Sequence, residues 1–433
     1  MQNRTTHSGV DVHSAPITAL LAAVRSDRLW QAHMDMATLG ATAKGGVRRL
    51  ALTDVDNAAR MRLIAQARNR GYEVFMDPAG NIFVRRAGRD TAAAPVMTGS
   101  HLDSQPTGGK FDGPLGVLAG MEVLYALDEA GIETERPVEV VSWTNEEGCR
   151  FIPGCMGSSC FASPQLLDDW ELLSDHEGIT VSQELQKLDA ALSDVPRRPL
   201  GVPVAAYLEM HIEQGVVLEN EKATVGVVSG IQGCRDFRVT ISGTDSHAGT
   251  TPSAFRRDAL KCAVHMLGVL YARMDMEGSD LRFTVGELNV LPNSSSVIPG
   301  RVTFLIDFRH PSQSALSEIG NEIREICLAN AGQCEVTIEE IRWRAPVLFP
   351  ESMKLMIQNA ADRQGKASRT LLSGASHDAV HLHRCCPSGM IFIPCAGGIS
   401  HNEAESADAS DIHAGTQVLA EVVYRLAMQP STD

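Results

Sequence analysis

The spacing of apolar and polar residues alternates between helical and strand-like segments along most of the chain. A helical period is present at about 15–36 and 53–71, and again over Leu115 to Ala130, where Gly131 suits a C-terminal cap. A last helix is expected over about 408–427. Short apolar runs predict strands at Glu73 to Met76, Ile82 to Arg85, Val96 to Thr98, Val138 to Trp143, Ala205 to Met210 and Met390 to Ile393. Strands that alternate with helices predict an α/β domain.

Residues 230–344 have a different pattern, which begins with a half-buried strand marked by Phe237, Val239 and Ile241. The remaining periods predict a helix at 253–274, strands near 281–290 and 301–309, a helix at 313–331 and a strand from Val336 to Ile341. The order βαββαβ is that of a ferredoxin-like sandwich. We therefore predict an α/β domain made of residues 1–229 and 345–433, with a smaller α+β domain, residues 230–344, inserted. The first 14 or so residues are expected to be disordered.

Composition narrows the class of partner. The 433 residues carry a net charge of −15, which argues against nucleic acid or an anionic membrane as the main partner. No apolar run reaches the roughly 18 residues that a membrane span needs, and Met1 to Ser14 lacks the apolar core of a signal peptide. Ten cysteines are scattered without paired C-x-x-C spacing, so we expect a cytoplasmic protein with free thiols.

Candidate metal ligands follow the predicted strands. His101 and Asp112 come just after the strand at Val96 to Thr98, at the kind of strand end where open α/β sheets place their sites. Asp103 is two residues beyond His101 and is expected to hold the second imidazole nitrogen. A histidine in such a loop, taken alone, is more often a loop residue without function, but the nearby glycines and the spacing favour a metal site.

Glu146 and Glu147 stand side by side after the strand at Val138 to Trp143. Two carboxylates repel each other in a partly dry site, and a cation nearby removes that cost. One of them can then bind a metal ion while the other takes a proton from the attacking water. A solvated acidic turn is the alternative if the pair is considered in isolation.

Further histidines complete the set. His211 ends an apolar strand, and His401 follows another strand through a glycine-containing loop. Three histidines and two or three carboxylates at four strand ends are enough for two divalent ions, and the absence of thiolate ligands suits Zn²⁺, Mn²⁺, Co²⁺ or Ni²⁺. His247 and His377 also lie in loops beside small residues, where each alone is more often a surface or packing histidine.

The motifs GSHLDSQPTGGKFDGPLG, NEEGCRF, HIEQG, DSHAGTTP and GISHNEAE occur in this order. With them the chain, from about residue 20 to 427, resembles the zinc-dependent amidase, hydantoinase and carbamoylase branch of the M20 dinuclear metallopeptidases. That branch includes N-carbamoyl-L-amino-acid hydrolases, allantoate amidohydrolases, β-ureidopropionases and ureidoglycolate amidohydrolases. The resemblance implies a hydrolase of linear amide C–N bonds, a lid and dimerisation domain at 230–344, and a homodimer.

The resemblance also implies roles for individual residues. His101, Asp112 and His211 would hold one ion, with Asp112 bridging to a second ion held by Glu147 and His401. Glu146 would be the general base, and His247 would reach the partner subunit's active site and steady the oxyanion. The implied substrate contacts are Gln214, His377 and Arg309, the last as a bidentate clamp for the substrate carboxylate.

Two positions depart from the pattern of this branch. Ser296, in Pro292-Asn-Ser-Ser-Ser296, stands where an asparagine usually contacts the substrate, and Ser376 replaces a usual glycine. Because these changes leave the predicted cage intact, hydrolysis is kept and the substrate stays open. We expect the groups that Ser296 presents opposite Arg309 to select it.

The leading hypothesis is an N-carbamoyl-L-amino acid as substrate, with allantoate or ureidoglycolate as the alternative. An M20-type dipeptidase or N-acyl amino acid deacylase is the competing enzyme class, which the HIEQG and DSHAGTTP pair disfavours. A non-enzymatic binding protein would need a broken cage or a lost base, and all six residues are present.

Overall fold

The computed structural model describes residues 14–278 and 280–430, and the chain divides into two compact units. The larger unit comprises the chain up to Ser229, then 349–371, and then His377 onward. The smaller unit comprises Gly230–Leu348 together with the short segment Leu372–Ser376. The N-terminal residues for which disorder is predicted lie, up to residue 13, outside the described part of the chain. No helix in the described ranges is long and apolar enough to cross a membrane.

The larger unit is built on a mixed sheet with the strand order β1-β2-β4-β3-β5-β15-β6, and β14 also pairs with β6. The central strands β4, β3, β5 and β15 run parallel to one another, whereas β2 and β6 join them antiparallel. The strands are β1 (Glu73–Met76), β2 (Ile82–Arg86), β3 (Val96–His101), β4 (Val138–Trp143), β5 (Ala206–Ile212), β6 (Val225–Ile231), β14 (Ser368–Ser373) and β15 (Ser388–Ile393). All six strands predicted for the α/β domain are present.

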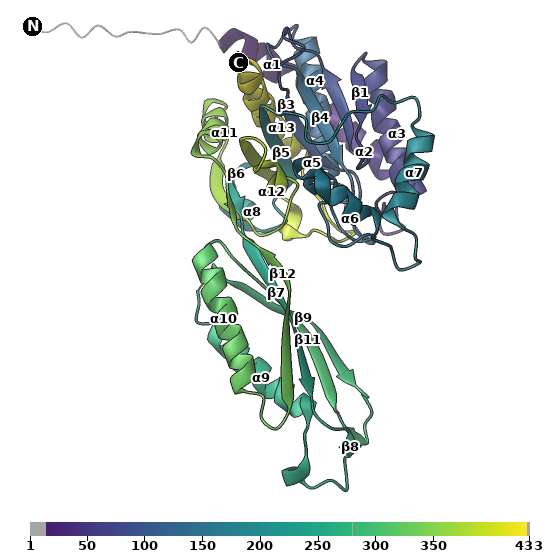
Figure 1. The fold of residues 1–433 in the computed structure, drawn as a ribbon. Coiled ribbons are helices and arrows are strands. Elements are labelled where there is room, and N and C mark those ends of the chain that lie inside the picture. Colours follow the sequence, from purple (N-terminus) through teal and green to yellow (C-terminus); the bar gives the residue numbers. More distant parts are fainter. Residues whose placement is uncertain (1–13, 279, 431–433) are drawn as a thin grey trace, which may run out of the picture. The chain divides into compact units, whose positions relative to one another are not determined.

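Helices cover both faces of this sheet. On β5, Met210 lies against α13, where the Thr416 hydroxyl donates to its sulfur, and the neighbouring Glu209 accepts from the N–H of Ala379 at the start of α12. Because successive side chains of a strand point to opposite faces, α13 and α12 pack on opposite sides. Helix α4 lies beside α13 along the same face (Figure 1). The helices are α1 (Ser14–Ala23), α2 (Ser26–Ala37), α3 (Asp54–Asn69), α4 (Pro114–Glu129), α5 (Met156–Ala162), α6 (Leu167–Glu171), α7 (Val181–Ala191), α8 (Val217–Glu221), α11 (Glu351–Arg363), α12 (Ala379–Leu382) and α13 (Ala409–Ala427).

The helical segment predicted at 15–36 is divided into two helices, α1 and α2, by a break at Val24 and Arg25. Arg25 between them is extended, with φ −107° and ψ 112°. Its N–H donates to the carboxylate of Glu122 at 2.6 Å, and the Arg28 guanidinium donates to the same carboxylate. This contact with α4 is tertiary, so the local period carries no trace of it.

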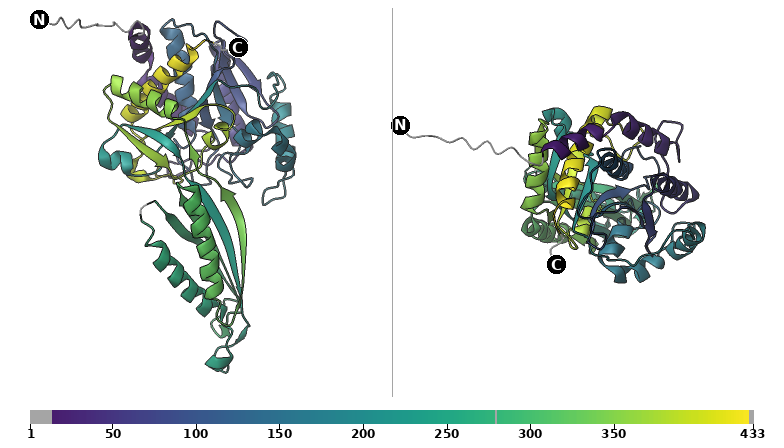
Figure 2. Two further views of the ribbon diagram at one scale, coloured as in Figure 1. Left: turned by 60° about the vertical axis from the view of Figure 1, so that its left-hand side comes forward. Right: turned by 90° about the horizontal axis from the view of Figure 1, so that it is seen from above.

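The smaller unit contains the predicted βαββαβ order. Its antiparallel sheet has the strand order β12-β7-β11-β9, and α9 and α10 lie side by side against one face of it (Figure 2, left). The elements are β7 (Gly233–Ser242), α9 (Ala259–Met274), β9 (Arg282–Leu291), β11 (Arg301–His310), α10 (Gln313–Ala329) and β12 (Glu335–Arg344). A two-stranded ribbon of β8 (Ser246–His247) and β10 (Val297–Ile298) extends it, and β13 (Val347–Leu348) pairs with Gly230 and Ile231.

The helix predicted from residue 253 begins later, at Ala259. The Asp258 side chain accepts from the N–H of Lys261 at 3.0 Å and so caps α9, while Ser253–Phe255 forms a separate 3₁₀ turn. The core between sheet and helices is apolar, with fully buried Phe237, Phe304 and Ile306 among its members.

Candidate metal centre

Four neighbouring strands bring the predicted ligands to one edge of the larger sheet. His101 is the last residue of β3, and His211 is the last but one of β5. Glu147 follows β4, and His401 follows β15 after a short loop. Because β4, β3, β5 and β15 are parallel neighbours, their carboxyl ends share an edge.

Asp112, in the loop between β3 and α4, lies at the centre of this group. Its Oδ1 is 3.0 Å from His211 Nε2 and 3.8 Å from His101 Nε2. Its Oδ2 is 3.2 Å from His401 Nε2, which in turn is 3.4 Å from Glu147 Oε2. The two oxygens of one carboxylate therefore face two different sets of side chains.

These side chains form two candidate cation sites, one of His101, Asp112 and His211 and one of Asp112, Glu147 and His401. Within each set the ligand atoms lie within 4.8 Å of one another. Two ligand atoms about 2.1 Å from one ion at a tetrahedral angle would be about 3.4 Å apart, so the observed separations suit a divalent ion. The structure thus brings all five predicted ligands together.

Burial and mutual repulsion make this cluster electrostatically demanding. Burial, and then the charges of Asp378 and Glu147, raise the pKa of Glu146 well above its usual range. Burial, and then the charge of Asp112, raise the pKa of Glu147 in the same way. Burial lowers the pKa of His211, but the hydrogen bond to Asp112 and the charges of Asp112 and Glu209 together raise it to about 9. A cation would remove the repulsion between these carboxylates, which is the second reason why the residues fit a metal ion.

Main-chain carbonyls orient the two buried histidines. His101 Nδ1 lies 2.9 Å from the carbonyl oxygen of Asp103, and His211 Nδ1 lies 2.9 Å from that of Ile212. Each Nδ1 therefore donates a proton to a carbonyl, which leaves Nε2, on the side of Asp112, as the nitrogen that would bind a metal ion. Gly113, with φ +84°, gives His101 its space, because a Cβ there would lie 2.3 Å from the imidazole.

Asp103 holds the second imidazole nitrogen of His101 through its main chain. It is the carbonyl of Asp103, and not its carboxylate, that makes the hydrogen bond to His101; the nearer carboxylate oxygen is 3.7 Å away. The carboxylate accepts instead from the N–H groups of Glu146 at 3.2 Å and Glu147 at 3.1 Å. Asp103 thus connects β3 to the loop that carries both glutamates.

Glu146 lies next to the first candidate cation site without belonging to either set. Its Oε2 is 3.5 Å from His101 Nε2, and its Oε1 accepts from the Cys155 thiol at 3.3 Å. The main chain is held as well, because the carbonyl of Glu146 accepts from the N–H of Cys155 at 2.8 Å. The carboxylate is 9% exposed, so it can meet a small molecule while most bulk water is excluded.

Two residues of this site were missed by the sequence reasoning. Gln105 donates its side-chain amide to Glu147 Oε2 at 2.7 Å and its main-chain N–H to Oε1 at 3.1 Å. The Ser400 hydroxyl lies 3.1 Å from Asp112 Oδ2. Both stand inside quoted motifs, but an amide or a hydroxyl in a loop carries no pattern of its own.

Gln214 and His377, both predicted substrate contacts, also lie at this site. Gln214 Nε2 donates to Asp112 Oδ2 and to the Ser400 oxygen, each at 3.0 Å. His377 is buried, and its ring centroid is 4.4 Å from that of His211.

The other predicted contacts, His247, Ser296 and Arg309, belong to the smaller unit. His247 is exposed in β8, and its Nδ1 accepts from the N–H groups of Gly249 at 3.0 Å and Thr250 at 3.2 Å. The carbonyl of Ser296 accepts from the N–H of Ala248 at 2.9 Å, so Ser296 and His247 share one loop cluster.

Ser296 does not lie opposite Arg309 within one chain. The β8–β10 ribbon adjoins the start of β11 at Arg301, whereas Arg309 is near the other end of that strand. The eight residue steps from Arg301 to Arg309 span about 27 Å at strand rise. Ser296 is therefore grouped with His247, and a substrate within reach of both Ser296 and Arg309 would need a second chain.

Arg309 is held in a fixed orientation. Its Nε and Nη2 donate to the two oxygens of Asp307, each at 2.9 Å, and its Nη1 donates to the carbonyl of Gly374 at 2.7 Å. A guanidinium has five N–H groups, so these bonds leave one on each terminal nitrogen. Arg309 and Asp307 line a hollow of about 620 Å³ in the smaller unit.

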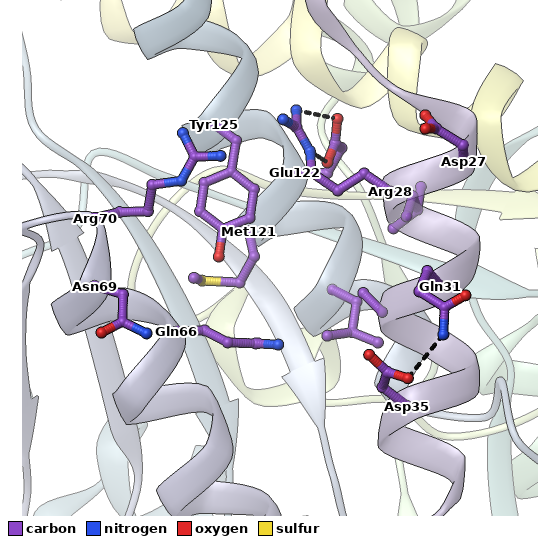
Figure 3. Close-up of a pocket in the computed structure, with 13 residues that line it drawn as sticks. Asp27, Arg28, Gln31, Asp35, Gln66, Asn69, Arg70, Met121, Glu122 and Tyr125 are labelled. Atoms are coloured by element: carbon purple, nitrogen blue, oxygen red, sulfur yellow. Dashed lines mark hydrogen bonds and ion pairs between the residues drawn. The ribbon is translucent and has the colours of Figure 1, made fainter.

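A separate hollow of about 640 Å³ lies among α2, α3 and α4 of the larger unit (Figure 3). Both of its arginines have partners within the hollow: Arg28 bonds to the buried Glu122, and the Arg70 guanidinium lies 4.5 Å from the centre of the Tyr125 ring. The predicted catalytic and metal-binding residues are not among its lining residues. We therefore assign the chemistry to the edge of the sheet and not to this hollow.

The larger unit, with two candidate cation sites at the carboxyl ends of its parallel strands, has the arrangement of a metal-dependent hydrolase. The model of the peptidase family M20/M25/M40 matches residues 97–425, and the chain belongs to this family. It is 38% identical over 412 residues to an N-carbamoyl-L-amino acid amidohydrolase of Geobacillus stearothermophilus, covering 93% of this chain and 99% of that one. It is 33% identical to an allantoate amidohydrolase of Bacillus subtilis, covering 90% and 95%.

A solved structure gives the same result for the fold. The crystal structure of an amidase of the hydantoinase/carbamoylase family from Burkholderia multivorans aligns with a TM-score of 0.87 and 44% identity. The alignment covers 94% of this chain and 99% of that one. The expected family and fold class are thereby confirmed.

Proposed function

We propose that this protein hydrolyses the linear amide C–N bond of an N-carbamoyl-L-amino acid and releases the amino acid, CO₂ and ammonia. The observation that carries this proposal is the position of Asp112, whose two oxygens face separate histidine sets beside the free carboxylate of Glu146. The carbamoylase relatives at 37 and 38% identity support this substrate class. The allantoate amidohydrolases, at 32 and 33% identity, support allantoate as the second candidate.

Two divalent ions, Zn²⁺ or Mn²⁺ by the ligand chemistry, would be held by His101, Asp112, Glu147, His211 and His401. When bound, they would polarise the scissile carbonyl and increase the acidity of the attacking water.

Proton transfer is assigned to Glu146. Cys155 holds Oε1, so Oε2 is the oxygen that takes a proton as water adds to the carbamoyl carbon. The same oxygen then passes this proton to the leaving nitrogen, which lets the C–N bond break without releasing an amide anion.

Gln214 is proposed to bind the ureido group. Its Nε2 donates to Asp112 and Ser400, which fixes the orientation of the amide. Among the described residues no partner for its buried Oε1 is present, so this oxygen can accept from a substrate N–H.

The substrate carboxylate is assigned to Arg309. Because Asp307 occupies the Nε–Nη2 side, the two terminal nitrogens still present a fork for one carboxylate.

Replacing Arg309 with lysine removes this fork, and KM is expected to rise about 10- to 100-fold while kcat changes less. Steady-state kinetics on N-carbamoyl amino acids measure the effect. Arg238→Lys, an exposed arginine of the same unit paired with Glu339, is the matched control. An unchanged KM for Arg309→Lys would show that Arg309 does not bind the substrate carboxylate.

His247 is proposed to act on the partner subunit's substrate within a homodimer. Because its Nδ1 accepts two main-chain N–H groups, its proton is on Nε2, which can donate to a developing oxyanion.

The dimer interface is assigned to the surface formed by α9 and the edge strand β9. Its exposed apolar side chains include Val264 on α9 (62% exposed), Leu291 on β9 (56%) and, two residues beyond the end of α9, Met276 (73%).

A substrate panel tests the proposed function. We expect turnover of N-carbamoyl-L-amino acids to exceed that of allantoate, ureidoglycolate, β-ureidopropionate and dipeptides, each assayed with Zn²⁺, Mn²⁺, Co²⁺ and Ni²⁺. Faster hydrolysis of allantoate would select the second candidate. Turnover of dipeptides alone would overturn both and favour the peptidases of this family.

A further inference from the structure

A buried glutamate outside the proposed ligand set contacts Asp112 from two sides. Glu405 lies four residues beyond His401 and is 2% exposed. Its Oε1 accepts from the main-chain N–H of Phe111 at 2.9 Å and from that of Asp112 at 3.0 Å. These bonds join the loop after β15 to the loop after β3, almost 300 residues apart in sequence.

The second oxygen of Glu405 reaches the Asp112 carboxylate through Ser400. Glu405 Oε2 is 2.9 Å from the Ser400 hydroxyl, which is 3.1 Å from Asp112 Oδ2. A hydroxyl has one proton, so Ser400 can donate to only one of the two carboxylates at a time. Ser400 therefore links the two carboxylates, and Glu405 fixes its position beside Asp112 Oδ2.

Gly109 lies against the Glu405 carboxylate and leaves no space for a side chain of its own. A Cβ at Gly109 would lie 2.0 Å from Glu405 Oε1, so only glycine allows the carboxylate to approach this loop. The neighbouring Glu403 makes a different contact: its carboxylate is 3.7 Å from the ammonium of the exposed Lys44.

We propose that Glu405 is a positioning residue that fixes the main chain and, through Ser400, the carboxylate of Asp112, and thereby sets the affinity of both cation sites. This inference rests on the proposed metal centre. Because Asp112 is shared, loss of Glu405 weakens both ions, whereas His401 faces Oδ2 alone and its loss weakens one.

Equilibrium binding of Zn²⁺, measured by competition with a chromophoric chelator in the absence of substrate, tests the proposal. For Glu405→Ala, affinity is expected to fall roughly 10- to 100-fold at both ions, the usual effect of removing a partner of a metal ligand. Glu405→Gln keeps an acceptor for the two N–H groups and is expected to stay within about threefold of the wild type. Glu403→Gln is the matched control with unchanged affinity, and His401→Ala is the reference for loss of one ion.

Ser400→Ala is a milder second variant, because Glu405→Ala leaves two buried N–H groups without an acceptor and can impair folding. It keeps both main-chain bonds, and a drop of about 3- to 10-fold in affinity is expected. Wild-type affinity in Glu405→Ala, an equal loss in Glu405→Gln, weakening of a single ion, or unchanged affinity in Ser400→Ala would each overturn the inference. Wild-type protein that binds fewer than two ions would instead refute the proposed metal centre itself.

Discussion

Glu146→Gln is expected to lower kcat roughly 10²- to 10⁴-fold, the range that a general base contributes, with bound metal unchanged. The amide retains the shape of the carboxylate and can still accept from the Cys155 thiol, but it cannot take a proton from water. Because Glu146 belongs to neither candidate cation site, metal content should not follow activity.

The measurement is kcat on an N-carbamoyl-L-amino acid together with metal analysis of the same sample. Full turnover of the glutamine variant would show that Glu146 is not the base. A parallel loss of metal would show that Glu146 is a metal ligand. The proposed roles of Glu146 as base and Glu147 as ligand would then be wrong.

His247→Ala is expected to lower kcat about 10²- to 10³-fold, because it removes the proposed donor to the oxyanion. The trans arrangement makes a stronger prediction for mixed dimers of His247→Ala and Glu146→Gln subunits. In such a dimer, one active site combines an intact Glu146 with an intact partner histidine. Random mixing of the two inactive proteins should then recover about a quarter of the wild-type activity, since half of the dimers carry one intact site of two.

Activity of the mixture is measured after verified subunit exchange, and each variant mixed with itself is the control. No recovery in confirmed heterodimers would contradict action in trans. Disrupting the exposed α9 surface with Val264→Glu provides a separate check, because a monomer should then be inactive although its Glu146 and ligands are intact.

Much of the site could be predicted because its chemistry follows strand ends. His101, Glu147, His211 and His401 each come at or just after an apolar run, and parallel neighbouring strands bring such positions to one edge. Glutamine, serine and a lone loop glutamate carry no comparable pattern, so Gln105, Ser400 and Glu405 emerged only from their contacts.

Strand register and the direction in which a group points could not be predicted from the sequence. The sequence does not show how far apart Ser296 and Arg309 lie in one chain; the antiparallel register of β11 separates the β8–β10 end of the sheet from the Arg309 end. Asp103 holds the second imidazole nitrogen of His101, and only the structure shows that it does so through its carbonyl. The periods that predict a strand do not say which group of a residue turns toward a neighbour.

The sequence by itself determined the two fold types, the family, and the candidate cage of His101, Asp112, Glu147, His211 and His401 with Glu146 beside it. The fold types follow from the local hydrophobic period, and the family and the candidate cage follow from the sequence motifs and their order. Both can be recognised without knowing which segments pack against each other. Only the tertiary structure decided that the two oxygens of Asp112 face different histidines and that Glu405 holds Asp112 from the far end of the chain. Such contacts join segments hundreds of residues apart, and their geometry is fixed by packing between elements and not within any one of them.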